Sequence, residues 1–183
     1  MSDYTIDPQV IVDFWRDAGP ERWFAKDEDF DATIRRRFGD VYEQAAAGER
    51  DAWIDEPTGA LALVILLDQF PRNLFRNSPQ AFATDAKALD IARTALKRRD
   101  DQVVGEDLNA LLAMPLMHSE NLADQEACVA WMDEIGGEGN RKAAVEHRDI
   151  IARFGRFPHR NATLGREPTA EELEFLAAGG FSG

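Results

Sequence analysis

Residues 68–76, 114–121 and 141–166 bring together side chains that could bind a ligand or move a proton. These segments combine carboxylates with histidines and arginines, the groups that proteins use for acid–base chemistry and for binding anions. Each segment contains a proline or a glycine, where a helix is expected to break. Side chains at such breaks can point into a shared cavity. We therefore expect Arg72, His118 and residues 153–161 to line one cleft.

The first segment begins with a carboxylate at the end of an apolar run. Asp68 continues the helical stripe of residues 61–65, so its side chain is expected to point toward the interior. A buried carboxylate needs a partner, and Arg72 or Arg76 is close enough in sequence to supply one. Two interpretations remain, a structural salt bridge or one wall of a ligand site that includes Arg72, Asn73 and Arg76.

The second segment follows Pro115, which is expected to interrupt a helix. His118, Ser119 and Glu120 could perform acid–base chemistry, or they could cap the next helix. A metal site would need His118 and Glu120 together with the distant His147, and no pair with helical ligand spacing supports it. We therefore expect no metal and no cofactor.

The third segment is a basic stretch in an acidic chain. Residues 141–166 contain seven lysines and arginines but only two acids. The planar guanidinium of arginine suits carboxylate and phosphate groups, so these bases could form an anion pocket. Alternatively, they could pair with acidic neighbours in the fold. The candidate ligand-binding residues here are His147, Arg153, Arg156, His159, Arg160 and Asn161.

Positions within this stretch predict different environments. His147 lies on an apolar helical stripe and is expected to be at least partly buried, which is more typical of a hydrogen-bonded core histidine than of a catalyst. Arg153 is expected to pair with Asp149 on the outer side of the helix. Residues 156–161 follow the helix stop at Gly155, in a loop that could fold back over a cleft.

Composition excludes several classes of protein. Acidic residues outnumber lysine and arginine by 34 to 21, and this net charge of −13 disfavours nucleic acid or an anionic membrane as the partner. The longest apolar run, residues 60–67, is too short to span a bilayer. Cys128 is the only cysteine, and Met1–Gln9 lacks the apolar stretch of a signal peptide. We expect a cytoplasmic protein with a packed core.

Helical periodicity dominates the chain, and strand signals are nearly absent. We expect one all-α domain over residues 1–183, with seven or eight helices joined in antiparallel hairpins. The central apolar helix is expected to end or kink at Phe70–Pro71. The first three expected helices span residues 8–18, about 27–47, and from after Pro57–Thr58 to Phe70. The fourth is capped by Ser78–Pro79 or by Thr84 and fades at residues 98–100, and the next three span about 106–114, 122–135 and 139–154. A last short helix starts at Thr169.

Three motifs of the chain are considered together, Leu67–Asn73, Met117–Glu120 and the long run His147–Asn161, with support from Val12–Trp15, Trp23–Phe24 and Leu164–Glu167. This set resembles a known bacterial family, DUF924, whose members are of unknown function. The resemblance covers nearly the whole chain. It implies an all-α fold similar to tetratricopeptide-repeat domains, a right-handed helical array, and it brings no established activity.

Two functions from different classes remain open. In the first, a cleft binds a small anionic ligand through Arg72, Asn73, Arg76, His118, Glu120, His147, Arg153, Arg156, His159, Arg160 and Asn161. In the second, a concave groove of the helical array receives a peptide or a partner helix, and the same polar residues are structural. The variety of arginine, histidine and asparagine favours the first, and catalysis stays open.

Overall fold

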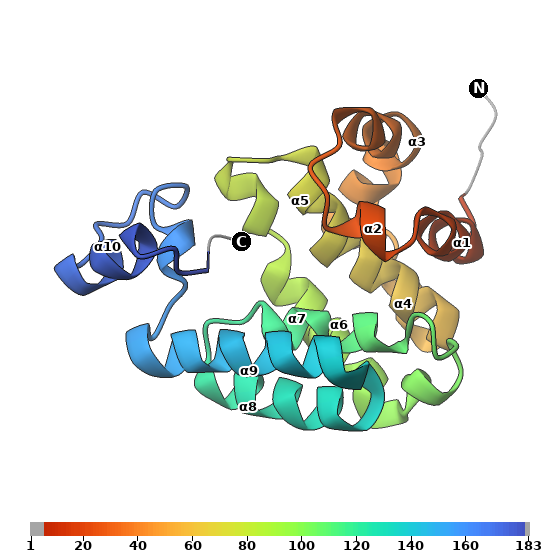
Figure 1. The fold of residues 1–183 in the computed structure, drawn as a ribbon. Helices are drawn as coiled ribbons and strands as arrows, with labels where there is room; N and C mark the ends of the chain where they lie inside the picture. The colour runs from red at the N-terminus through yellow and green to blue at the C-terminus, as the bar shows by residue number, and fades with distance from the viewer. Residues whose placement is uncertain (1–5, 182–183) are drawn as a thin grey trace.

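The computed structural model describes residues 6–181, and all regular structure in that stretch is helical (Figure 1). This confirms the all-α prediction. The longer helices are α1 (Pro8–Ala18), α3 (Glu28–Ala46), α4 (Pro57–Val64), α6 (Asp85–Arg98), α8 (Leu122–Trp131), α9 (Gly137–Phe154) and α10 (Ala170–Ala177). Shorter turns are α2 (Pro20–Trp23), η1 (Asp51–Asp55), η2 (Ile65–Gln69), α5 (Phe70–Leu74), η3 (Pro79–Phe82), η4 (Asp100–Gln102), η5 (Asn109–Ala113), α7 (Met114–Met117), η6 (Met132–Gly136) and η7 (Pro158–Arg160).

An aromatic core joins the first helices to the centre of the molecule. Helix α1 begins where the Asp7 carboxylate accepts a hydrogen bond from the Gln9 backbone, and Pro8 occupies its first turn. Its Phe14 and Trp15 pack against Phe38 of α3 and Phe70 of α5, with ring centroids 4.8–6.2 Å apart. This packing fixes one side of the central helix.

The central helix is buried on all sides and continues further than expected. Phe70–Pro71 does not end it, because the chain widens into the π-helical turn η2 and stays helical through α5 to Leu74. Pro71 has no N–H to donate to the Leu67 carbonyl, and the Thr84 hydroxyl donates to that carbonyl instead, at 2.6 Å. The π turn therefore accommodates the proline and places Asp68 in the interior.

The segment around Pro115 differs from its prediction. In place of one helix over residues 106–114, the chain forms the 3-10 turn η5 and then the short helix α7. Pro115 lies in the first turn of α7, where its missing N–H costs no helical hydrogen bond. The proline thus begins a helix here, and it brings His118 to the C-terminal end of that helix.

Helices α8 and α9 form an antiparallel hairpin that packs against α7 (Figure 1). The π-helical turn η6 ends α8, and Gly137, with a φ of 68°, reverses the chain. Helix α9 therefore begins at Gly137, two residues before its predicted start.

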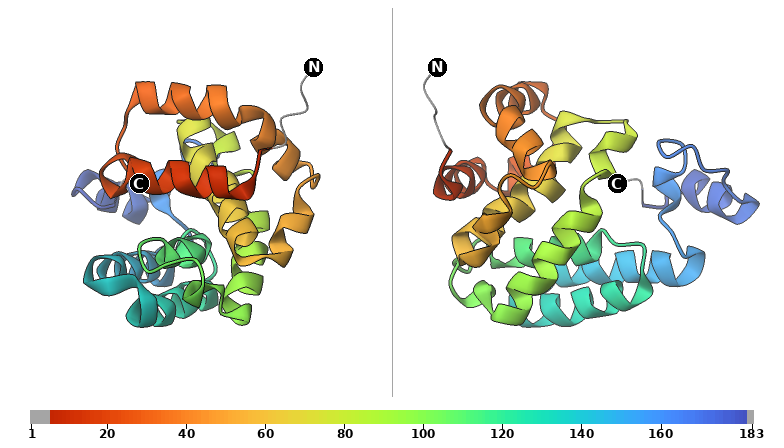
Figure 2. Two further views of the ribbon diagram at one scale, coloured as in Figure 1. Left: turned by 90° about the vertical axis from the view of Figure 1, so that its right-hand side faces the viewer. Right: turned by 180° about the vertical axis from the view of Figure 1, so that it is seen from behind.

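Residues 156–181 form a C-terminal unit at one side of the molecule, coloured blue in Figures 1 and 2. A small second core holds this unit against the end of α9, with Ile150, Ile151 and Phe157 buried beside Phe154, Phe175 and Phe181. Its helix α10 begins with the predicted capping box of Thr169 and Glu172.

Along residues 6–181, no helix combines the length and the apolar character needed to cross a bilayer. Most of Met1–Gln9, where no signal peptide was expected, lies outside the described residues. The tetratricopeptide-like handedness and repeat order of the helices stay a prediction.

Candidate functional site

A buried carboxylate and a histidine from distant segments form the centre of the candidate site. Asp68 is 0% exposed, and its two oxygens lie 2.7 and 3.0 Å from Nδ1 of His118. The Gln69 amide also donates to Asp68, at 2.6 Å. Turn η2 supplies Asp68 and the end of α7 supplies His118, so each side chain sits where an irregular helix turns it inward.

Arg72 connects this pair to a second carboxylate. Its Nη1 atom lies 3.6 Å from Asp68, and Nη1 and Nη2 donate to the two oxygens of Asp85, at 3.0 and 3.1 Å. Asp85 begins α6, where the positive end of the helix dipole favours a negative charge. A bidentate pair of this kind fixes the orientation of the guanidinium plane.

Arg160 reaches the same carboxylate from the C-terminal unit. Its Nη1 atom lies 3.5 Å from Asp85, and its guanidinium lies over the rings of Phe82 and Phe157, at 4.6 and 4.7 Å from their centroids. The residue is 7% exposed, and its Nε–H has no hydrogen-bond partner among the described residues. We call Asp68, Arg72, Asp85, His118 and Arg160 the Asp68 cluster.

Electrostatics set the protonation of this cluster. Burial alone would raise the pKa of Asp68, but His118 and Arg72 lower it, so Asp68 is ionised at neutral pH. Burial and Arg72 lower the pKa of His118 below its ordinary value, so the imidazole is neutral and its Nδ1–H donates to Asp68. Burial and the charge of Arg72 lower the pKa of Arg160 to about 10. The guanidinium is still protonated at neutral pH, but its charge is incompletely compensated.

Glu120 ties the C-terminal unit to the body of the protein. Its carboxylate accepts two hydrogen bonds from Arg166, at 2.7 and 3.0 Å, and one from the Phe157 backbone, at 2.8 Å. Burial would raise the pKa of Glu120, but these donors lower it, so Glu120 is a charged anchor. Glu120 therefore acts as a structural ion-pair partner of Arg166 rather than as a proton donor.

Arg156 and Asn161 belong to another structural cluster. The Arg156 guanidinium donates to both oxygens of buried Glu172, at 2.6 and 2.8 Å, and the Asn161 amide donates to one of them, at 3.2 Å. Arg156 is therefore not a free loop cation. Arg153 pairs with Glu171 at 2.8 Å and not with Asp149 as expected, because α10 lies beside the end of α9.

The two remaining histidines, His147 and His159, pack among the aromatic rings of the C-terminal unit. His147 is buried as predicted, and its Nδ1 lies 2.8 Å from the Ala143 carbonyl, so Nδ1–H donates within the helix. His159 packs against the rings of Phe157 and Phe181, and its buried Nδ1 has no partner among the described residues. Burial and the charge of Arg160 lower the pKa of His159 to about 4.

Arg76 and Asn73 face a different carboxylate from the one expected. Arg76 binds both oxygens of Asp31 on α3, at 2.5 and 2.9 Å, and the Asn73 amide donates to Asp31 at 2.8 Å. Arg76 is therefore not the partner of Asp68. These three residues form a separate brace between α3 and α5.

The arginines of residues 141–166 all have acidic partners. The pairs are Arg141–Asp133, Arg148–Asp149, Arg153–Glu171, Arg156–Glu172, Arg160–Asp85 and Arg166–Glu120. Pairing with acidic neighbours therefore accounts for most of the basic stretch. Arg160 differs from the others because it shares its acidic partner, Asp85, with Arg72.

Of the predicted set, the structure thus brings together Arg72, His118 and Arg160. The other eight predicted residues lie outside the Asp68 cluster: Asn73, Arg76, Glu120, His147, Arg153, Arg156, His159 and Asn161. Asp85 and Arg166 are partners that sequence reasoning missed. The position of Asp85 in the first turn of an expected helix was a weak signal, and Arg166 lies in a motif of the family.

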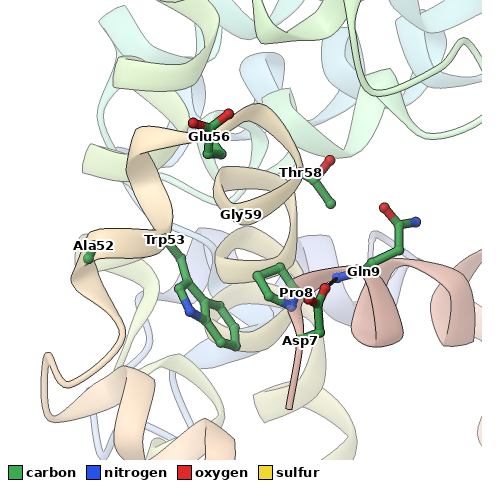
Figure 3. A pocket seen from close by; sticks show the side chains of 8 residues that line it. All are labelled: Asp7, Pro8, Gln9, Ala52, Trp53, Glu56, Thr58 and Gly59. Carbon is green, nitrogen blue, oxygen red and sulfur yellow. Dashed lines mark hydrogen bonds between the residues drawn. The ribbon is translucent and has the colours of Figure 1, made fainter. Parts of the chain in front are cut away.

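Two surface hollows lie away from the Asp68 cluster. One, of about 350 Å³, is lined by Asp7, Trp53, Glu56 and their neighbours at the beginnings of α1 and α4 (Figure 3). The other, of about 330 Å³, lies between Trp23, Phe24, Met114 and the glycines that begin α9. Within residues 6–181, no three histidine, cysteine or acidic side chains gather as a metal site.

Comparisons with known proteins identify relatives of the same fold. The family model described as bacterial protein of unknown function (DUF924) matches residues 11–180. A protein of unknown function from Agrobacterium tumefaciens, ATU0120, has a solved structure that is 44% identical in sequence. The similarity covers 93% of this chain and 97% of that one, with a TM-score of 0.90. Among curated proteins, none matches. The chain therefore belongs to the DUF924 family of bacterial proteins.

Proposed function

We propose that this protein binds a small oxyanion, a phosphate or a carboxylate, at the Asp68 cluster, with Arg160 as its principal contact. The observation that carries the proposal is the state of Arg160. This guanidinium is buried, its Nε–H has no partner among the described residues, and its one carboxylate contact is 3.5 Å long.

A buried arginine normally has several of its five N–H donors satisfied, because an unpaired buried charge destabilises the fold. Here Asp85 is already held by both terminal nitrogens of Arg72. An oxyanion with two or three oxygens would supply acceptors to Arg160 in the forked geometry that guanidinium groups favour. This is the arrangement expected of a ligand site whose ligand is anionic.

The neighbouring His118 suits the same ligand. Its Nδ1–H is committed to Asp68, so Nε2 is the free nitrogen of the ring and can accept a proton or a hydrogen bond. A protonated oxyanion, such as hydrogen phosphate, would offer that hydrogen. Asp68 then fixes the ring by the same logic that orients a catalytic histidine.

Ligand-dependent thermal unfolding tests the proposal. Inorganic phosphate, sulfate, acetate and citrate are each titrated into the full-length protein and into Arg160→Gln. A ligand at one hundred times its Kd stabilises the native state by about 2.7 kcal/mol. For a chain of this size, that corresponds to a rise in Tm of about 5–11 °C.

Arg153→Gln is the matched control, because Arg153 pairs with Glu171 on the surface and lies outside the cluster. We expect one or more anions to stabilise wild type and Arg153→Gln equally, and to leave Arg160→Gln unchanged. Equal stabilisation of all three proteins would contradict a site at Arg160, and so would no stabilisation of any.

The alternative function, a groove for a peptide or partner helix, has a narrower basis. Phe24 is 65% exposed beside the hollow lined by Trp23 and Met114. A single exposed ring is common on protein surfaces, whereas a buried and incompletely paired charge is not. We therefore favour the anion site. A cytoplasmic location, suited to the unpaired and buried Cys128, is part of the same proposal.

A further inference from the structure

We propose that His118 accepts a phosphoryl group on Nε2 from a small phosphoryl donor bound at the Asp68 cluster. This inference deepens the proposed function and rests on it, since the oxyanion would be the phosphoryl group of the donor. It makes His118 a site of covalent modification.

The geometry singles out this histidine and this ring nitrogen. Nδ1 of His118 faces both oxygens of Asp68, so the ring is fixed and Nε2 points away from the carboxylate. Both hydrogen bonds of this ring to the described residues are made by Nδ1, and the side chain keeps 16% of its surface exposed. A neutral imidazole in this tautomer presents the Nε2 lone pair as a nucleophile.

Two guanidinium groups belong to the cluster, Arg72 in contact with Asp68 itself and Arg160 in contact with the neighbouring Asp85. Arg72 also contacts Asp85, and Arg160 reaches that carboxylate from the C-terminal unit. In phosphoryl transfer, positive groups beside the equatorial oxygens of the phosphoryl group stabilise the charge that those oxygens carry in the transition state. Arg160 holds an Nε–H donor that has no partner among the described residues and that such an oxygen would satisfy.

The transfer step balances without a further reagent. The Nε2 lone pair forms the N–P bond while the bond from phosphorus to the leaving group breaks. With phosphoramidate as the donor, the leaving group is the nitrogen of the donor, which already carries the proton that it needs and departs as ammonia. The ring becomes positively charged, keeps its Nδ1 proton, and is stabilised by ionised Asp68. Water can later cleave the N–P bond and release inorganic phosphate.

The other histidines provide comparators within the same molecule. Nδ1 of His147 donates to the Ala143 carbonyl, so that ring has no carboxylate to stabilise a positive charge. His159 lies among Phe157 and Phe181, and neighbouring Arg160 disfavours a positive charge on its ring. Neither histidine should compete with His118 for a phosphoryl donor.

The test is to incubate the full-length protein with phosphoramidate and to map phosphorylated peptides by mass spectrometry at alkaline pH, where phosphohistidine survives. We expect one phosphoryl group on His118, added at least about tenfold faster than on either other histidine, which is a barrier difference of about 1.4 kcal/mol. Mapping the wild-type chain needs no variant to fold. Arg160→Gln should slow the labelling of His118, and His147→Gln should not.

Each other outcome overturns the inference in a distinguishable way. Equal labelling of the three histidines, or none on His118, refutes the special role of this ring. Labelling that is unchanged in Arg160→Gln refutes the dependence on the oxyanion site. Thermal stabilisation by phosphate without any label on His118 would leave the proposed anion site intact and exclude phosphoryl transfer to it.

Discussion

Replacing Asp68 with alanine is expected to destabilise the protein through His118 rather than through Arg72. Asp68 is completely buried and accepts hydrogen bonds from His118 Nδ1 and from the Gln69 amide. Arg72 lies further away, at 3.6 Å, and keeps its two hydrogen bonds to Asp85 when Asp68 is removed. The groups left without an acceptor are therefore the imidazole and the amide.

The magnitude follows from those two donors. A buried donor without a partner costs about 1–3 kcal/mol, so the pair gives about 2–6 kcal/mol. Removing one member of a buried ionic cluster costs about 3–5 kcal/mol in comparable cases. We expect Asp68→Ala to lower the free energy of unfolding by about 3–5 kcal/mol. The corresponding fall in Tm is about 6–20 °C.

Urea denaturation followed by circular dichroism measures this loss. Asp90→Ala is the matched control, since Asp90 is an acid on α6 whose side chain is 77% exposed and, among the described residues, pairs with Arg93 alone. The control should change stability by no more than about 0.5 kcal/mol. A loss below about 1 kcal/mol for Asp68→Ala would refute the reasoning. The double variant Asp68→Ala/His118→Leu should regain part of the lost free energy of unfolding, because it no longer contains the imidazole donor that Asp68→Ala leaves without an acceptor.

Three further perturbations test other parts of the structure. Glu172→Gln should cost about 2–4 kcal/mol by chemical denaturation, because buried Glu172 accepts from Arg156, Asn161 and a backbone N–H, and a cost below about 1 kcal/mol would contradict its role as an anchor. The pKa of His159 is about 4 in the folded protein and about 6.5 in an unfolded chain, so the unfolded state binds the proton first. Stability should therefore fall as the pH drops from about 6.5 to about 4, by on the order of 2 kcal/mol from this residue, and His159→Gln should flatten that part of a pH–stability curve. Burial raises the pKa of Cys128 to about 12, so an aromatic disulfide reagent should modify the native thiol only as fast as the protein opens, and rapid modification of the folded protein would count against this burial.

Burial of the key carboxylate was predictable from the sequence, but its partner was not. The apolar stripe of residues 61–65 predicts an inward Asp68, and the structure buries the central helix on all sides, including the π turn that carries Asp68. His118 lies fifty residues further along the chain. Local spacing suggested Arg72 or Arg76, and only the tertiary structure, which brings the end of α7 to Asp68, shows that a histidine takes the nearest position.

The central helix illustrates a limit of local rules. Proline ends helices because it lacks an N–H and crowds the preceding turn. At Pro71 the freed Leu67 carbonyl accepts from Thr84, a residue whose position depends on the fold of η3 and α6. The chain therefore stays helical past Pro71, from the π turn η2 into α5, and no local pattern indicates that Thr84 would be there.

For the basic stretch of residues 141–166, the sequence predicted the charge but not which arginine would lack a close partner. Its charge was evident from composition, and pairing with acids was one of the two interpretations. Which arginine stays incompletely paired depends on Phe82 and Phe157, whose rings flank Arg160. Two aromatic residues far apart in the sequence decide that position, so composition could not distinguish Arg160 from Arg156.

The most direct test of the anion site is the NMR signal of the Arg160 Nε–H group during a titration with inorganic phosphate. This donor has no partner among the described residues, whereas Nε of Arg153 is bonded to Glu171. We expect the chemical shift of the Arg160 Nε–H signal to change and then reach a plateau as phosphate is added, while the chemical shift of the Arg153 signal stays constant. An Arg160 signal that does not move, or one that moves no more than that of Arg153, would contradict the binding of an oxyanion at the Asp68 cluster.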